Sequence, residues 1–199
     1  MVKRLVSSIL LFGVSLYVWS SDDEGNFAVK SVGMAKCSQF VEEKAKDAEG
    51  HSLFLGWMDG YISGANQFNS QTYDLIPWGN SLFLGALLES HCKQNPDEYF
   101  YVAVNRLAGN WLPLRIKQQS PVVEAGEGEQ HVAVYQEIMQ KLQGLLRQDN
   151  FYQGPIDGAY SDNLKAALEA YQQSAGLKVT GLPDFLTLQT LFQGPGTTD

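Results

Sequence analysis

Two short turns rich in glycine divide the C-terminal part of the chain into three amphipathic segments. Apolar residues recur every three or four positions in residues 132–148, as on one face of a helix. A second helix is expected to begin after the N-cap Ser161, and a third to follow Pro183. The C-terminal part of the chain is therefore expected to contain three helices joined by two tight turns.

The turns and the helices beside them carry a linked set of motifs. In chain order these are G-x-I-D-G-x-Y at residues 154–160, A-x-x-x-Y-Q at 167–172, G-L-x-V-T-G at 176–181 and D-x-x-T at 184–187. Together they closely resemble the peptidoglycan-binding-like domain of bacterial cell-wall proteins, over about residues 135–192. The resemblance implies a noncatalytic module of three helices that holds peptidoglycan in a shallow groove.

The resemblance also implies which side chains contact the wall polymer. Aromatic faces of exposed tyrosines can stack on sugar rings, and polar groups can bond the stem peptide or the acetamido groups. Asp157 and the glycines have a second interpretation, since the turns need them whatever is bound. The peptidoglycan-binding candidates are Tyr152, Asp157, Gly158, Tyr160, Tyr171 and Gln172.

The first twenty residues have the anatomy of a secretory signal peptide. Lys3 and Arg4 precede an uncharged apolar run from Leu5 to Trp19, and Ser20 supplies a small residue before an acidic segment. The run is shorter than the roughly 20 residues that cross a bilayer. We therefore expect a signal peptide over residues 1–20, cleaved near Ser20, with a periplasmic or secreted product and no stable membrane insertion afterwards. An uncleaved anchor is the alternative.

The chain has only two cysteines, Cys37 and Cys92. In an oxidising compartment, two thiols in a small domain are most simply explained by one disulfide between them. Two unpaired buried thiols are the alternative. The expected disulfide would tie together a helical bundle over residues 21–117.

Apolar spacing supports helices in this N-terminal region. Phe54 to Phe68 carry one stripe, with Gly56, Gly60 and Gly64 on another face, where we expect a second helix to pack closely. Further helices are expected at residues 81–92 and from the N-cap Asn95. Residues 118–131 have the composition of a linker, residues 132–193 form the second domain, and residues 194–199 form a flexible tail. The predicted fold class is mainly α.

The N-terminal region faintly resembles periplasmic bundles such as the HdeA-like acid chaperones and the type VI secretion immunity proteins. The shared features are an early cysteine, a Gly-Tyr-Ile-x-Gly helix at residues 60–64, and a later cysteine followed by Asn-Pro. This resemblance implies a periplasmic protein partner, so the bundle would serve protein interaction, as a chaperone or an immunity module. Tyr73 and Trp78, in the loop at residues 69–80, would form the partner surface, although burial in the core fits them equally.

An enzyme in the N-terminal region is the competing hypothesis. Ser90-His91-Cys92 is similar to the nucleophile region of L,D-transpeptidases, and Glu89-Ser90 to the acidic site of lytic transglycosylases, but the other motifs of both families are missing. A divergent wall hydrolase or transpeptidase therefore stays an alternative, as does a wall-binding fold reused for protein interaction.

Composition argues against several other classes of function. The formal net charge of -8 argues against binding to nucleic acid or to anionic lipid, both of which need a basic surface. His51, His91 and His131 are too scattered to form a zinc site. We expect no metal and no cofactor.

Overall fold

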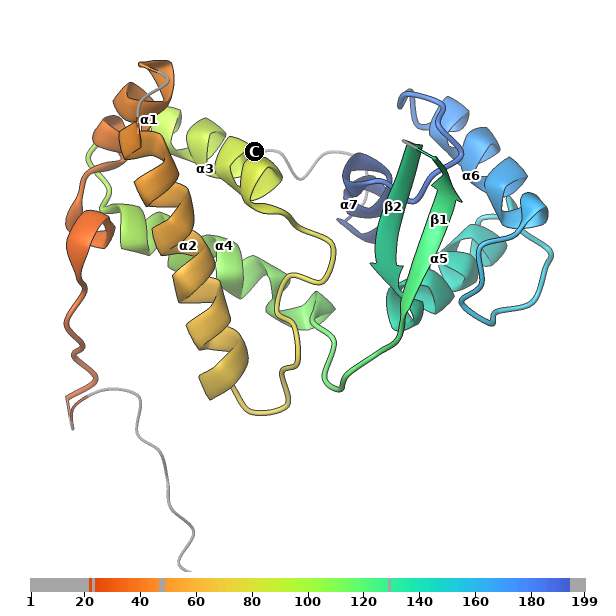
Figure 1. Cartoon of the computed structure of the whole chain (residues 1–199), viewed down its shortest axis with the longest axis horizontal. Coiled ribbons are helices and arrows are strands. Elements are labelled where there is room, and N and C mark those ends of the chain that lie inside the picture. The colour runs from red at the N-terminus through yellow and green to blue at the C-terminus, as the bar shows by residue number, and fades with distance from the viewer. Residues whose placement is uncertain (1–21, 23, 47–48, 129, 194–199) are drawn as a thin grey trace, which may run out of the picture.

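The computed structural model describes residues 22, 24–46, 49–128 and 130–193. The predicted signal peptide and the predicted tail lie outside these residues. The described chain is mainly helical, and Figure 1 shows two lobes, which we define as the N-terminal lobe (residues 22–117) and the C-terminal lobe (residues 118–193). No helix in the described ranges is both long and apolar enough to span a bilayer.

Four α-helices build the N-terminal lobe around an aromatic core. Phe40, Phe54 and Phe100 pack at centroid distances of 4.9–5.4 Å, and Phe40 and Phe100 have no exposed surface. Asn80 begins the third helix by accepting a hydrogen bond from the Phe83 amide at 3.1 Å. The elements are η1 (Ser31–Met34), α1 (Cys37–Ala45), α2 (Glu49–Phe68), α3 (Ser81–Gln94), α4 (Phe100–Trp111) and η2 (Leu112–Leu114).

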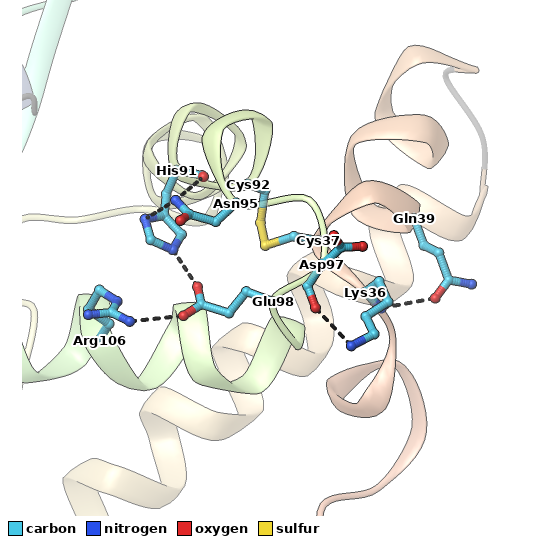
Figure 2. Close-up of a disulfide and its surroundings, with 9 residues drawn as sticks. All are labelled: Lys36, Cys37, Gln39, His91, Cys92, Asn95, Asp97, Glu98 and Arg106. Atoms are coloured by element: carbon cyan, nitrogen blue, oxygen red, sulfur yellow. Dashed lines mark hydrogen bonds and ion pairs between the residues drawn. A yellow bond between two sulfur atoms is a disulfide. The ribbon is translucent and has the colours of Figure 1, made fainter.

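The predicted disulfide between Cys37 and Cys92 is present and fully buried. It joins the start of α1 to the end of α3 (Figure 2). The adjoining turn is fixed by His91 and Arg106, which contact the Glu98 carboxylate at 2.5 and 2.9 Å. Partial burial by itself raises the pKa of Glu98, but the hydrogen bonds and the charges of His91 and Arg106 together lower it. The disulfide and the contacts of Glu98 therefore connect α1, α3 and α4.

The C-terminal lobe places a β-hairpin against three helices. Strands β1 (Val122–Glu127) and β2 (Gln130–Tyr135) are antiparallel, with Val122 opposite Tyr135. Three helices follow, α5 (Gln136–Gln148), α6 (Asp162–Ser174) and α7 (Phe185–Gln193), and their apolar faces enclose one core. Ser161 caps α6 as predicted, accepting from the Leu164 amide at 3.3 Å.

Three sequence predictions about local structure were wrong. The expected linker and the expected start of a helix at 132 form the hairpin instead, because Val123, Ala125, Val132 and Val134 alternate inward. Asn95 ends α3 rather than capping α4, which begins at Phe100.

The third concerns the expected close packing at the glycine face of α2. Gly56, Gly60 and Gly64 face open space, because a Cβ at any of them would meet no described atom within 4 Å. No other helix of the described chain therefore packs closely against these three glycines.

Aromatic side chains join the two lobes. Phe83 of α3 stacks on Phe185 of α7 at 4.2 Å, and Trp78 lies 4.8 Å from Phe192. The Tyr135 hydroxyl donates to the Asp74 carboxylate at 3.2 Å. The loop between α2 and α3 and the first turn of α3 therefore contact the C-terminal lobe.

Candidate ligand-binding site

Buried Gln143 holds the first glycine turn of the C-terminal lobe. Its side-chain amide donates to Asp157 Oδ1 at 3.0 Å and to the Ala159 carbonyl at 3.1 Å, and it accepts from the Gly158 amide at 2.8 Å. Hydrogen bonds from the Ala159 amide and from Gln143 lower the pKa of Asp157. Asp157 and Gly158, both predicted to contact the ligand, are thus committed to the turn. Gln143 was missed, although it is a polar residue flanked by Met139 and Leu146 on the apolar face of α5.

Buried Gln172 holds the second glycine turn. Its Nε2 lies 3.0 Å from Thr180 Oγ1 and 2.9 Å from both the Leu182 carbonyl and Thr187 Oγ1. Its Oε1 accepts from the amides of Thr180 and Gly181, both at 2.8 Å. With no exposed surface, Gln172 has no atom left for a ligand.

The tyrosine candidates are mostly buried. Tyr152 is only 2% exposed and donates to the Pro155 carbonyl at 3.0 Å, so the expectation of an exposed stacking ring is wrong there. Tyr171 packs edge-on against Phe151 in the core. Tyr160 is half-buried and donates to the Gly181 carbonyl at 2.9 Å, which links the two turns.

The turn at Gly158 gives a direct test of this structural role. Gly158 has φ +78°, and an added Cβ would lie 2.8 Å from the Gln136 carbonyl oxygen. We expect Gly158→Ala to lower the free energy of unfolding by roughly 1–3 kcal/mol. The matched control is Gly144→Ala in α5, where a Cβ meets nothing within 4 Å and a gain of up to about 1 kcal/mol is expected. Denaturant titration measures both, and equal effects would contradict the assignment.

A cleft of about 720 Å³ lies between the lobes. One wall comes from the N-terminal lobe, with Asp74, Trp78 and Phe83, and the other from β2 and from the segment around α7. Phe83 is 37% exposed and Leu186 54% exposed, so apolar surface is open to a ligand here. The cleft brings together Trp78 and Asp74 with the C-terminal lobe, which the sequence could not anticipate.

The charged side chains that line the cleft differ in their hydrogen bonds and ion pairs. Asp74 accepts from Tyr135, and burial together with this carboxylate raises the pKa of Tyr135 to about 12. Asp184 accepts from Thr180 at 2.9 Å. Lys178 is exposed and makes no ion pair within the described ranges. The predicted partner residue Tyr73 lies beside the cleft, 40% exposed and 6.1 Å from the Tyr135 ring.

The residues weighed as catalytic groups do not fit that role. Cys92 is bonded to Cys37 and is not a thiolate. Hydrogen bonds from Lys44 and Lys93 hold the pKa of Glu89 below its usual value. A general acid is favoured by a raised pKa, and the surroundings of Glu89 shift its pKa in the opposite direction.

Comparison with known proteins adds one finding. Residues 135–191 match the family model described as "Putative peptidoglycan binding domain". Searches of curated proteins and of solved structures gave no match. The match covers both glycine turns and the three helices up to residue 191, and the C-terminal lobe is therefore similar to a peptidoglycan-binding domain.

Proposed function

We propose that this protein is exported and binds peptidoglycan through its C-terminal lobe without cleaving it. The observation that carries this proposal is the family match over residues 135–191. The two motif turns are each held by a buried glutamine, which supports a stably folded domain over the matched residues. The N-terminal lobe would contact a periplasmic protein, with Tyr73 at the partner surface.

The absence of catalysis is the second part of the proposal. Support comes from Glu89, whose pKa is lowered by Lys44 and Lys93, and from Cys92, which is held in a disulfide. A wall hydrolase or transpeptidase would need a different catalytic group.

The test is sedimentation of the mature chain with purified sacculi. We expect the protein to pellet with sacculi, and dye-labelled sacculi to release no dye above the level of buffer. Glu89→Gln should leave both results unchanged, since the carboxylate serves the ion pairs with Lys44 and Lys93. Failure to pellet would favour a wall-binding fold reused for protein interaction. Dye release that Glu89→Gln abolishes would establish a hydrolase instead.

A further inference from the structure

A polar pocket of about 220 Å³ lies in the C-terminal lobe, where the end of the hairpin meets the second glycine turn and the start of α6. Among its lining residues it shares only Thr180 with the cleft between the lobes. It is smaller than the roughly 300–1,000 Å³ of sites for drug-sized ligands, so it has room for one small group such as a single sugar ring. The polar side chains that line it are those of Glu127, Gln130, Tyr160, Asp162, Lys165 and Thr180.

The hairpin forms one wall of this pocket because it packs closely against the second glycine turn. Gly126 has φ +102°, and a Cβ added there would lie 2.8 Å from Leu182 Cδ2. Glu127 and Gln130 are paired across the two strands at this end of the hairpin, and both line the pocket. These two residues precede the matched residues 135–191, so the hairpin adds a wall to the domain that the family model describes.

Four of the lining side chains are free to bind a ligand. Glu127, Gln130, Asp162 and Lys165 are exposed, and none of their side chains makes a hydrogen bond or an ion pair with a described residue. Tyr160 differs, because its hydroxyl donates to the Gly181 carbonyl at 2.9 Å and fixes the ring in the wall. The pocket therefore offers two carboxylate acceptors, an ammonium donor, an amide that can donate and accept, and one fixed aromatic ring.

The charges around the pocket disfavour an acidic ligand. Two lining carboxylates, Glu127 and Asp162, are balanced by only one ammonium group, that of Lys165. Burial, together with the negative charges of Glu169 and Asp162, raises the pKa of Tyr160, so this phenol stays neutral. A ligand carboxylate would be repelled here. A neutral ligand whose hydroxyls both donate and accept hydrogen bonds can satisfy the carboxylates and the ammonium group together.

We propose that this pocket binds one neutral sugar ring of the glycan strand of peptidoglycan. A sugar hydroxyl can donate to a carboxylate and accept from the lysine, and the tyrosine ring offers an apolar surface to the C–H groups of the sugar. The inference rests on the proposed function, since it takes peptidoglycan as the ligand. Within that polymer the N-acetylated sugars are neutral, whereas the stem peptides carry free carboxylates that the pocket would repel.

The first test compares two ligands on the full mature chain by NMR titration. The probes are tri-N-acetylchitotriose, a neutral oligomer of N-acetylglucosamine, and the free stem tetrapeptide. We expect the sugar to shift the amide signals of Glu127, Gln130 and Thr180, and the tetrapeptide to leave them unchanged. Equal binding of the tetrapeptide in this pocket would overturn the proposal, and so would sugar-induced shifts confined to the cleft between the lobes.

The second test uses matched variants in each wall. Asp162→Asn, Lys165→Gln and Glu127→Gln should each weaken chitotriose binding about fivefold, because a hydrogen bond to a charged group becomes one to a neutral group. The controls are Lys178→Gln and Glu124→Gln, which remove exposed charges outside the pocket and should bind as the wild type does. Because all five side chains are exposed, each variant should unfold close to the wild type, so a loss of affinity reports on the pocket.

Each outcome bears on one proposal. Unchanged affinity in Asp162→Asn and Lys165→Gln overturns the sugar site, and unchanged affinity in Glu127→Gln overturns the contribution of the hairpin to it. If the wild-type chain pellets with sacculi but binds no chitotriose, the inference fails while wall binding stands. If the chain does not pellet, the proposed function itself fails.

Discussion

Replacing both Cys37 and Cys92 with alanine is expected to lower the free energy of unfolding of the N-terminal lobe by about 4 kcal/mol. The disulfide links residues 55 positions apart, and in the chain-entropy model a loop of this length greatly restricts the unfolded chain. Both cysteines are buried, at 0% and 1% exposure, so the double variant also loses packing. A small domain has only about 5–15 kcal/mol of stability in total, and this loss is a large share.

Denaturant titration of the mature chain would measure this loss of stability, and amide hydrogen exchange would show which lobe is destabilised. Amide hydrogen exchange should rise in α1 and α3, which the bond joins, and stay unchanged in α5 and α6. Treating the wild-type protein with a reductant is the control, because it breaks the bond without changing a side chain. The prediction is contradicted if the double variant and the reduced protein both unfold at the midpoint of the oxidised wild type.

The parts of the fold that the sequence predicted depend on local signals. Ser161 caps α6 because a serine before an amphipathic run satisfies a free amide at the helix start. The disulfide followed from the presence of two cysteines and an expected export signal. The linked turn motifs predicted the C-terminal domain, and the family match over residues 135–191 confirms it.

The parts that the sequence did not predict depend on contacts between distant residues. The hairpin was not predicted because residues 122–131 are rich in glycine and glutamate. Only four of its residues follow the inward apolar alternation that is typical of a strand. Asn95 could have capped either neighbouring helix, and the hydrogen bond from its amide to the His91 carbonyl at 2.9 Å places it at the end of α3. The cleft needs both lobes, so no segment of the sequence contains it.

The same limit applies to the candidate site. Sequence motifs could not distinguish residues that contact a ligand from residues that shape a turn. Tyr152 and Gln172 are buried, and Asp157 accepts a hydrogen bond within its own turn, so each of these candidates has a structural role. The exposed groups, Lys178 and Phe83, belong to no predicted contact set. The motif residues therefore predict the fold, whereas the residues that are available to a ligand are identified by the solvent exposure of their side chains.

Replacing Gln172 with leucine is expected to lower the free energy of unfolding of the C-terminal lobe by roughly 3–5 kcal/mol. Leucine fills a similar volume but leaves the amides of Thr180 and Gly181 and the Leu182 carbonyl without their partner. Each buried polar group that loses its hydrogen bond costs about 1–3 kcal/mol. We expect melting of this lobe at a lower temperature, with faster hydrogen exchange in residues 176–187 than in the N-terminal lobe.

The neighbouring Gln173 provides a matched control, since it is exposed and its side chain makes no hydrogen bond with any described residue. Gln173→Leu should unfold close to the wild type. If Gln172 were instead a ligand contact, Gln172→Leu would weaken binding to sacculi and leave the melting temperature unchanged. If Gln172 acts through the turn, the variant should melt at a lower temperature than the wild type. It should still bind sacculi at temperatures low enough for the lobe to be folded.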